Sequence, residues 1–559
     1  MGIERRTTPM SRTTRTASRP LVGLFCVLAL TACGSREDAD LVLHNGKIVT
    51  VDEAFSIHEA VAVRDGRIVE LGGNDLVARY DAARTIDLGG KTVLPGFNDT
   101  HIHISGSPIR EIDLRETSSI AQMQEQIRAK VAEIGEGEWI TGYGWAEDQF
   151  AEQRMPTRAD LDAAAPGNPV TLTRAGGHSA VVNSMAFDLA EITRDSRDPA
   201  RGIIERDARG ELNGIIRERQ DTVERLVPPA TAEETRPSFI RNLSDLLELG
   251  ITSLAHAGVS PRGYEEWATV YAEHGEELPR ANVQIRWAGR DGMEAFGMKT
   301  GDGDERIRVG AVKVFVDGGF TGPSAYTIDE YKSEPGFRGS LDIDPEELRA
   351  IVHDAHEMGW QMGFHAIGDA AIQLIVDYFA EELDANPREN HRHYLNHFTV
   401  RPPAETMEKM AEHDILITQQ ANFTYTLESR YVENLHEEHA AHNNPVKSPM
   451  DHGVFVALSS DILPIGPMVG IYAAVTRKGV SGATYAPEEE AITVEEAIIG
   501  YTRNGAYITF EEDIKGTLEP GKLADMIVLS EDILTVDPER ILDIEVETTI
   551  LGGRVVFER

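Results

Sequence analysis

The chain has 559 residues, of which 41% are hydrophobic and 26% charged, and its formal net charge is −39 at pH 7. This length can bury more than one large core, and the composition is ordinary for a globular protein. The negative charge disfavours binding to nucleic acid through a basic surface, so we expect no nucleic-acid partner. The only cysteines, Cys26 and Cys33, lie near the N-terminus, which excludes cysteine-ligated metal sites in the rest of the chain.

The first 33 residues predict an export signal. Arginines precede an apolar block over residues 21–32, which is too short to span a bilayer stably. The block ends in Leu30-Thr31-Ala32-Cys33, which resembles a bacterial lipoprotein box. We therefore expect a signal peptide over 1–33, a tether over 34–40, and a lipid anchor on Cys33 that holds the protein at the periplasmic side of the cell envelope, with the outer membrane as one option. An ordinary secretory signal is the alternative.

Both ends of the remaining chain show strand patterns. Residues 41–93 alternate apolar stretches with Asn-Gly and Asp-Gly pairs, which are hairpin signals. Residues 515–559 have the same character. We predict one small β-sandwich built from these two segments.

The middle of the chain, from residue 249, alternates strand-like and helix-like stretches. Repeated β-then-α units imply a parallel sheet with right-handed crossovers. The eight apolar runs that predict strands cover 93–103, 251–257, 283–288, 309–316, 361–365, 394–398, 415–418 and 454–458. Eight strands close a (β/α)8 barrel, so we predict an α/β fold with a TIM barrel over residues 94–514 and an active site at the carboxyl ends of its strands.

Residues 104–248 separate the first two predicted barrel strands, which is far too long for a simple connection. We predict an inserted cap subdomain over the mouth of the barrel, where it would exclude water and select the substrate. Trp145, His178 and Asn183 are candidates for lining the substrate site. The alternative for these residues is a place in the core or the turns of the cap.

His101 and His103 follow the first predicted barrel strand. Residues two apart in a strand point to the same face, so both imidazoles can give a nitrogen to one divalent metal. The alternative is two surface histidines after the turn at Pro95-Gly96. The absence of cysteine leaves His, Asp, Glu and Lys as further ligands.

Other residues with metal-binding or catalytic chemistry stand at the later predicted strands. Lys313 lies inside an apolar strand, His365 and His397 end the next two, and Asp461 follows the last. A buried lysine costs several kcal/mol unless it is paired or chemically altered. One strand-end histidine is usually a satisfied core residue, but this ordered set argues against coincidence. His256 ends the second strand and is a further candidate for contacting the substrate.

Together these motifs resemble the amidohydrolase superfamily from about residue 41 to residue 557. Two phrases in the insertion are similar to the branch of N-substituted formamide deformylases. The motifs that carry the resemblance are Pro95-Gly96-Phe97 before the two histidines, Val312-Lys313-Val314-Phe315, Phe364-His365, Asn396-His397, Ser460-Asp461, the closing segment 516–525, and, for the branch, Gly142-Tyr143-Gly144-Trp145 and 177–184.

The resemblance implies one or two divalent ions, with zinc as the first expectation. The six implied metal ligands are His101, His103, Lys313, His365, His397 and Asp461. The opening pair would bind one ion and the two later histidines the second. Lys313, carboxylated on its amine, would bridge both ions, and Asp461 would also act as the catalytic base. Glu218 is a lower-ranked alternative for the bridge, and a buried ion pair is the alternative for Lys313. Asn396 departs from the acidic residue expected before His397 and is expected to alter the hydrogen bonding around that histidine.

The implied activity is the hydrolysis of a non-peptide carbon–nitrogen bond of a small molecule by a metal-activated hydroxide. An amide, a formamide or a cyclic amide is the expected substrate class. A deaminase or lactonase on the same site is one alternative, and phosphate-ester chemistry is another. A lipid-anchored binding protein on a decayed enzyme fold is a third, which the presence of all six candidate ligands disfavours. A homodimer is compatible with the sequence.

Overall fold

The computed structural model describes residues 36–175 and 177–559. The signal peptide over 1–33 and the anchor on Cys33 lie outside these residues, so they and the envelope location stay predictions. Within the described part of the chain, no helix combines the length and the apolar character needed to cross a bilayer.

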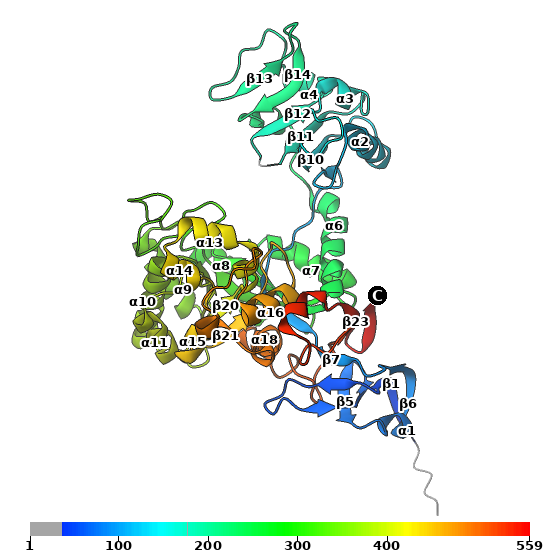
Figure 1. The fold of residues 1–559 in the computed structure, drawn as a ribbon, viewed down its shortest axis with the longest axis vertical. Helices are drawn as coiled ribbons and strands as arrows, with labels where there is room; N and C mark the ends of the chain where they lie inside the picture. The colour runs from blue at the N-terminus through cyan, green and yellow to red at the C-terminus, as the bar shows by residue number, and fades with distance from the viewer. Residues whose placement is uncertain (1–35, 176) are drawn as a thin grey trace, which may run out of the picture.

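Strands from both ends of the chain form two sheets that pack against each other (blue and red in Figure 1). The first sheet has the order β5-β4-β1-β6, with β1 (Glu37–His44), β4 (Ala60–Arg64), β5 (Arg67–Gly72) and β6 (Tyr80–Asp87). The second has the order β24-β23-β22-β7-β2-β3, with β2 (Lys47–Val49), β3 (Ile57–His58), β7 (Thr92–Pro95), β22 (Met526–Leu529), β23 (Val546–Leu551) and β24 (Arg554–Glu558). Leu43, Val61, Met526 and Ile550 share one buried cluster between the sheets.

The predicted tether over 34–40 needs a correction. Glu37 already pairs with Tyr80, and β1 continues from there alongside β6. The backbone of residues 37–40 therefore belongs to the sheet, because its hydrogen-bonding groups find partners in β6.

Eight parallel strands form the central unit, and each overlaps one of the predicted barrel strands. They are β8 (Phe97–Ile102), β15 (Ile251–Val259), β16 (Arg280–Arg286), β17 (Ile307–Lys313), β18 (Gly363–Ala366), β19 (Tyr394–His397), β20 (Leu416–Gln419) and β21 (Val456–Leu458). They form two four-stranded sheets, with the orders β17-β16-β15-β8 and β18-β19-β20-β21. The arrangement is a TIM-barrel-type α/β fold.

The two four-stranded sheets meet at two seams. Isolated parallel bridges join Val312 to Met362 and Phe315 to His365 at one seam, and Ile102 to Asp461 at the other. The sequence predicted a continuous closed barrel, but isolated bridges replace full ladders at these seams. Both seams carry predicted site residues, so the breaks in the ladder lie where the side chains of the site emerge.

Helices follow the strands and cover the sheets. They are α7 (Gly263–His274), α8 (Arg290–Phe296), α9 (Pro345–Glu357), α10 (Asp369–Ala385), α11 (Ala404–Glu412), α12 (Asn422–Thr426), α13 (Glu428–Asn434), α14 (Glu437–Ala441), α15 (Lys447–Asp451), α16 (Pro467–Thr476), α17 (Pro487–Glu490), α18 (Val494–Tyr501) and α19 (Arg503–Ile508). The N-terminus of α9 is fixed by a helix cap. The Asp344 side chain accepts hydrogen bonds from the N–H groups of Glu346 and Glu347.

The insertion forms a separate sheet with the order β13-β14-β12-β11-β10-β9. Its elements are β9 (Glu111–Asp113), α2 (Ile120–Ile134), β10 (Ile140–Trp145), α3 (Arg158–Asp162), β11 (Val170–Arg174), β12 (Ser179–Val182), α4 (Ser184–Leu189), β13 (Ile203–Arg206), β14 (Leu212–Arg217) and α5 (Asp221–Glu224). The helix α6 (Ala232–Asp245) leads back to the barrel.

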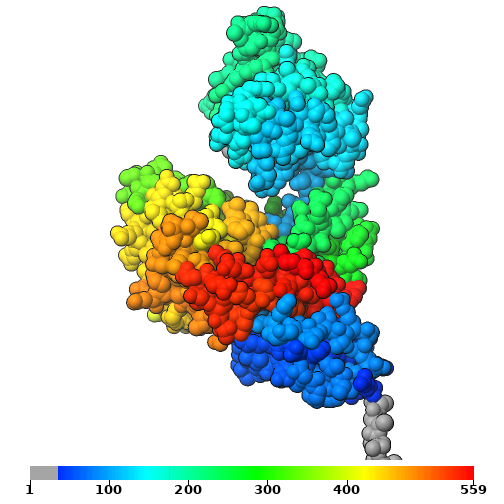
Figure 2. All heavy atoms as spheres, turned by 45° about the vertical axis from the view of Figure 1, so that its right-hand side comes forward, coloured from blue at the N-terminus to red at the C-terminus, as the bar shows by residue number. Residues whose placement is uncertain are grey.

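The cap does not lie over the barrel mouth as the sequence predicted. It stands off from the barrel, and Figure 2 shows open space between the two bodies. The physical reason is that the buried apolar side chains of the cap, such as Trp145 and Phe187, pack in clusters within the cap itself. The residues of the insertion that join the cluster of the barrel core lie at its two ends, Ile104 at the start and Phe239, Leu243 and Leu246 at the return.

Candidate active site

Four histidines converge at the carboxyl ends of the barrel strands. The ring centroids of His101 and His103 are 5.3 Å apart, and those of His101 and His397 are 4.7 Å apart. The His365 ring lies 4.4 Å from that of His397. Residues that are up to 296 positions apart in the sequence therefore meet because β8, β18 and β19 end at the same edge of the fold.

Asp461 lies beside this group of rings. One carboxylate oxygen, Oδ1, is 3.7 Å from Nε2 of His103, and the other, Oδ2, is 3.9 Å from Nδ1 of His397. One potential ligand atom each from His101, His397 and Asp461 lies within 4.8 Å of the other two. The Asp461 N–H donates to the His101 carbonyl oxygen at 2.7 Å, which fixes the aspartate across the seam between β8 and β21.

Lys313 ends β17 and is 1% exposed. Gly258 leaves room for it: the φ of this glycine is +118°, and a Cβ there would lie 3.2 Å from Cβ and Cγ of Lys313. Burial lowers the pKa of Lys313 to about 7, against the opposing effect of the Asp461 charge. Burial also raises the pKa of Asp461 to about 6.

The histidines of the site are neutral imidazoles at pH 7. Burial, with the Lys313 charge, lowers the pKa of His103 to about 4 and that of His365 to about 3. The pKa values of His101 and His397 are lowered well below the usual range, also chiefly by burial. The neutral form is the one that ligates a metal ion.

The unpaired polar atoms of the site show that a metal ion fits. Nε2 of His101, Nζ of Lys313 and Oδ1 of Asp461 are buried without a hydrogen-bond partner in the described part of the chain. Buried polar atoms are normally paired, because leaving one unpaired costs about 1–3 kcal/mol. Nitrogen and oxygen donors without thiolates suit a divalent ion such as zinc.

Two amide side chains orient the buried histidines. The Nδ1–H of His101 donates to Oδ1 of Asn396 at 2.6 Å, and the Asn396 amide is itself held because its Nδ2 donates to the Gly363 carbonyl at 2.8 Å. His397 donates in the same way to Oε1 of Gln420 at 2.7 Å. Each contact leaves Nε2 as the free ligand atom. We expected Asn396 to act on His397, but it acts on His101, because the amide points across the barrel rather than along its own strand.

Two buried aspartates also support the site and were missed in the sequence. Asp99 accepts from the N–H groups of His101 at 3.3 Å and Ser460 at 3.1 Å, which joins the two edges of one seam. Asp317 accepts from Ile367 and Gly368 at 2.9 and 2.8 Å and so fixes the loop after His365. The signal for Asp99 was its place two residues before His101.

Two predicted substrate contacts are wrong. Trp145 is fully buried in the cap, where its Nε1–H donates to the Leu172 carbonyl at 2.8 Å. Asn183 is also fully buried, and its Oδ1 caps α4 by accepting from the Ala186 N–H at 3.0 Å. Both side chains serve the interior of the cap.

His178 and Glu218 are not brought to the metal ligands either. Their side chains are 78% and 58% exposed, and they pair with each other on the cap at 3.1 Å. The structure therefore corrects the alternative in which Glu218 bridges the metals, because the carboxylate lies on the outer body. His178 lines neither of the two cavities that contain His103.

Two cavities share His103 as a lining residue. One, of about 270 Å³, is also lined by His365, His397 and Asp461, with Phe320, Phe423 and Tyr431 on its apolar side. The other, of about 460 Å³, contains His256. The Nδ1 atom of His256 accepts a hydrogen bond from the Ile104 N–H at 3.2 Å, and the centroids of the His256 and Trp267 rings are 4.6 Å apart. These contacts fix the orientation of the buried His256 side chain beside the second cavity.

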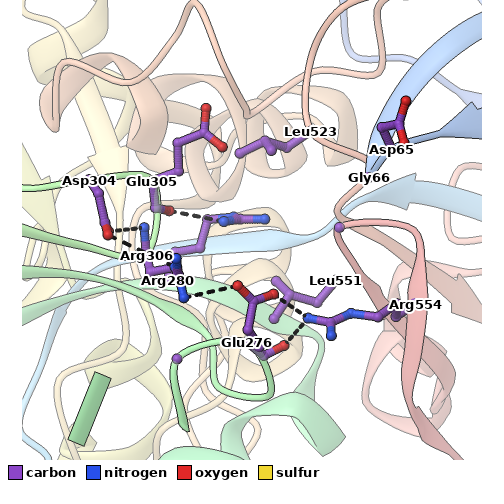
Figure 3. Close-up of a pocket in the computed structure, with 12 residues that line it drawn as sticks. Asp65, Gly66, Glu276, Arg280, Asp304, Glu305, Arg306, Leu523, Leu551 and Arg554 are labelled. Atoms are coloured by element: carbon purple, nitrogen blue, oxygen red, sulfur yellow. Dashed lines mark hydrogen bonds and ion pairs between the residues drawn. The ribbon is translucent and has the colours of Figure 1, made fainter. Parts of the chain in front are cut away.

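A third cavity, of about 440 Å³, lies where the β-sandwich meets the amino ends of the strands (Figure 3). Its basic side chains are paired with acids. Arg306 and Arg554 both contact Glu276, at 2.9 and 2.8 Å, and Arg280 binds Asp525 through two hydrogen bonds of 2.7 and 3.1 Å. Because these charges satisfy one another, we interpret this region as a structural contact.

Comparison with known proteins finds similarity over most of the chain. The model of the amidohydrolase family matches residues 84–557. A putative amidohydrolase, YtcJ of Bacillus subtilis, is 30% identical over 93% of this chain and 99% of its own. The N-substituted formamide deformylase of Arthrobacter pascens is 30% identical over 93% of this chain and 98% of its own. A solved structure of an uncharacterized metal-dependent hydrolase from Pyrococcus furiosus matches with a TM-score of 0.69 and 26% identity, covering 89% of this chain and all of that one.

Proposed function

The chain belongs to the amidohydrolase family, and from this premise we propose that it is a metal-dependent hydrolase of a non-peptide carbon–nitrogen bond in a small amide, formamide or cyclic amide. The observation that carries the proposal is the set of three buried ligand atoms, on His101, Lys313 and Asp461, that have no hydrogen-bond partner among residues 36–175 and 177–559. The similarity to a formamide deformylase over nearly the whole chain supports the choice of a carbon–nitrogen bond.

In this proposal His101, His103 and Asp461 would hold one divalent ion and His365 and His397 a second, with zinc as the first choice. Lys313, once carboxylated on Nζ, would supply a carboxylate ligand to both. Its amine supports this assignment because it is buried and has no hydrogen-bond partner in the described residues. Bound there, the ions would acidify a water molecule and polarise a substrate carbonyl oxygen.

Asp461 carries the proton through the reaction. Its carboxylate takes a proton from the attacking water and returns it to the leaving nitrogen as the carbon–nitrogen bond breaks. Burial raises the pKa of Asp461 above its ordinary value, which favours the uptake and return of a proton by this carboxylate. Asn396 and Gln420 keep the histidines in one tautomer, so that their Nε2 atoms stay directed into the site.

The test is a screen of N-formyl, N-acyl and cyclic amides on protein loaded with zinc, with the variant Asp461→Asn as control. We expect turnover of at least one amide class, and a loss of about 10²- to 10⁴-fold in kcat in the variant at unchanged metal content. Lactones and aminated heterocycles in the same screen test the two alternatives on this site. Full activity of Asp461→Asn would remove the aspartate as base, and protein that binds no metal would favour the decayed binding protein.

A further inference from the structure

Arg286 is the residue that points to a substrate class. It ends β16 and is paired in register with Lys313, the last residue of β17. Partners in register on neighbouring strands project from the same face of a sheet. The side chain of Arg286 therefore rises on the same side as Lys313, toward the mouth of the barrel.

Gly258 gives independent evidence for this direction. A Cβ on this glycine would lie 3.2 Å from Cγ of Lys313 and 3.4 Å from Cγ of Arg286. Both side chains thus pass over the same glycine at the end of β15. Unlike Lys313, however, Arg286 is exposed and can be reached by a ligand.

Arg286 lines the cavity of about 460 Å³ that shares His103 with the cavity of the metal ligands. A small molecule with its reacting carbonyl beside His103 and Asp461 can therefore extend a second group toward Arg286. Ile104, Phe239 and Trp267 contribute apolar side chains to the lining of this cavity.

The charges in this cavity leave Arg286 free. No hydrogen bond or ion pair of its side chain occurs within residues 36–175 and 177–559. The one acid of the lining, Glu266, is engaged by Arg236 through two hydrogen bonds of 2.8 and 3.0 Å. The ligand group that matches a single available guanidinium is a single carboxylate, which it can bind through two parallel hydrogen bonds.

We infer that Arg286 binds a carboxylate of the substrate, so that the enzyme acts on amides that carry an acid group, such as N-acylated amino acids. This inference rests on the proposed function for its chemistry. The anion site itself rests on the placement of Arg286, so the two can be tested apart.

The experiment compares N-formylphenylalanine with its primary amide, N-formylphenylalaninamide, whose aromatic ring suits the wall of the cavity. Affinities are measured by calorimetry on zinc-loaded Asp461→Asn protein, in which turnover is expected to be about 10²- to 10⁴-fold slower, with Arg286 intact or changed to Gln. The control is Arg262→Gln, which removes an exposed arginine at the start of α7 that lines neither cavity containing His103. Metal content is measured in each protein.

We expect the acid to bind about 10- to 100-fold more tightly than the amide, because a hydrogen bond to a charged group contributes on this scale. Arg286→Gln should abolish the preference, Arg286→Lys should restore part of it, and Arg262→Gln should leave it unchanged. Equal binding of acid and amide, binding of neither, a similar loss for both in Arg286→Gln, or loss of metal from that variant would overturn the inference.

A parallel turnover assay on the two compounds, with Asp461 intact, separates this inference from the proposed function. Hydrolysis of both compounds at equal kcat/KM keeps the hydrolase and removes the role of Arg286. A binding preference for the acid without hydrolysis of any amide keeps the anion site and removes the proposed function.

Discussion

The charged side chains at the two ends of the barrel differ in whether they are paired with one another. At the amino ends, Arg280 and Asp525 are buried as a bidentate pair that ties the β-sandwich to β16. At the carboxyl ends, Lys313 is buried and Asp461 half-buried among neutral histidines, and each has an atom without a hydrogen-bond partner in the described residues. The first arrangement is complete without a ligand, whereas the second becomes complete only when an ion or a substrate joins it.

This difference separates stability from function along one strand. β16 begins at Arg280, in the paired region, and ends at Arg286, in the proposed anion site. A variant at its first residue should change the free energy of unfolding, and a variant at its last should change the affinity for a ligand.

Arg280→Met should destabilise the protein by about 3–5 kcal/mol, because it leaves the buried Asp525 carboxylate without its cation. Urea denaturation of the wild type, this variant and a double variant measures the change in the free energy of unfolding. The double variant Arg280→Met/Asp525→Leu should recover much of the loss. A single variant with unchanged stability would show that the pair contributes nothing to the contact between sandwich and barrel.

Lys313→Met should have opposite effects on two forms of the protein. In the metal-free form it removes an unpaired buried amine, so the free energy of unfolding should rise by about 1 kcal/mol or more. In zinc it should lose the stabilisation that wild-type protein gains, which is about 4 kcal/mol at a metal concentration 1,000 times Kd. Thermal melts with zinc and with a chelator measure both, and equal stabilisation of variant and wild type by zinc would contradict a ligand role for Lys313.

Asn396→Leu should weaken metal binding by about 10- to 100-fold, since His101 would lose the acceptor that fixes its tautomer. Gln420→Leu should act similarly through His397. Competition with a chromogenic chelator measures the affinity. Asn396→Asp, which keeps an acceptor, should retain binding, and an unchanged affinity in Asn396→Leu would show that the amide does not orient His101.

Acid should destabilise the barrel through His391, whose pKa burial lowers to about 4 from the ordinary 6.5. A histidine with a lowered folded pKa takes up protons more readily when unfolded, so its stabilising contribution is present above pH 6.5 and is lost as the pH falls toward 4. The slope in this window is about 1.4 kcal/mol per pH unit for one proton. Urea titrations between pH 7 and 4.5 should show a slope that is smaller by about one proton in His391→Gln; an identical slope would exclude His391.

The strands and the strand ends that carry the candidate ligands could be predicted from local patterns, because an apolar run and a histidine at its end span only a few residues. The hydrogen-bond partners of those ligands could not be predicted, because contacts such as that between His101 and Asn396 depend on how the two sheets meet. The cap shows a different limit. Asn183 precedes Ser184 at the start of α4, so the sequence did contain the signal for a helix N-cap. The position of the cap subdomain, by contrast, depends on which of its apolar faces are buried in its own interior.

The number of zinc ions bound per chain tests the metal site most directly. It is measured by elemental mass spectrometry on wild type and on the double variant His101→Ala/His397→Ala. We predict one or two ions in the wild type and almost none in the double variant, which should still fold because its strands and helices are unchanged. Wild-type protein without metal, or a double variant with the same content, would contradict the claim that these residues converge to hold the ion.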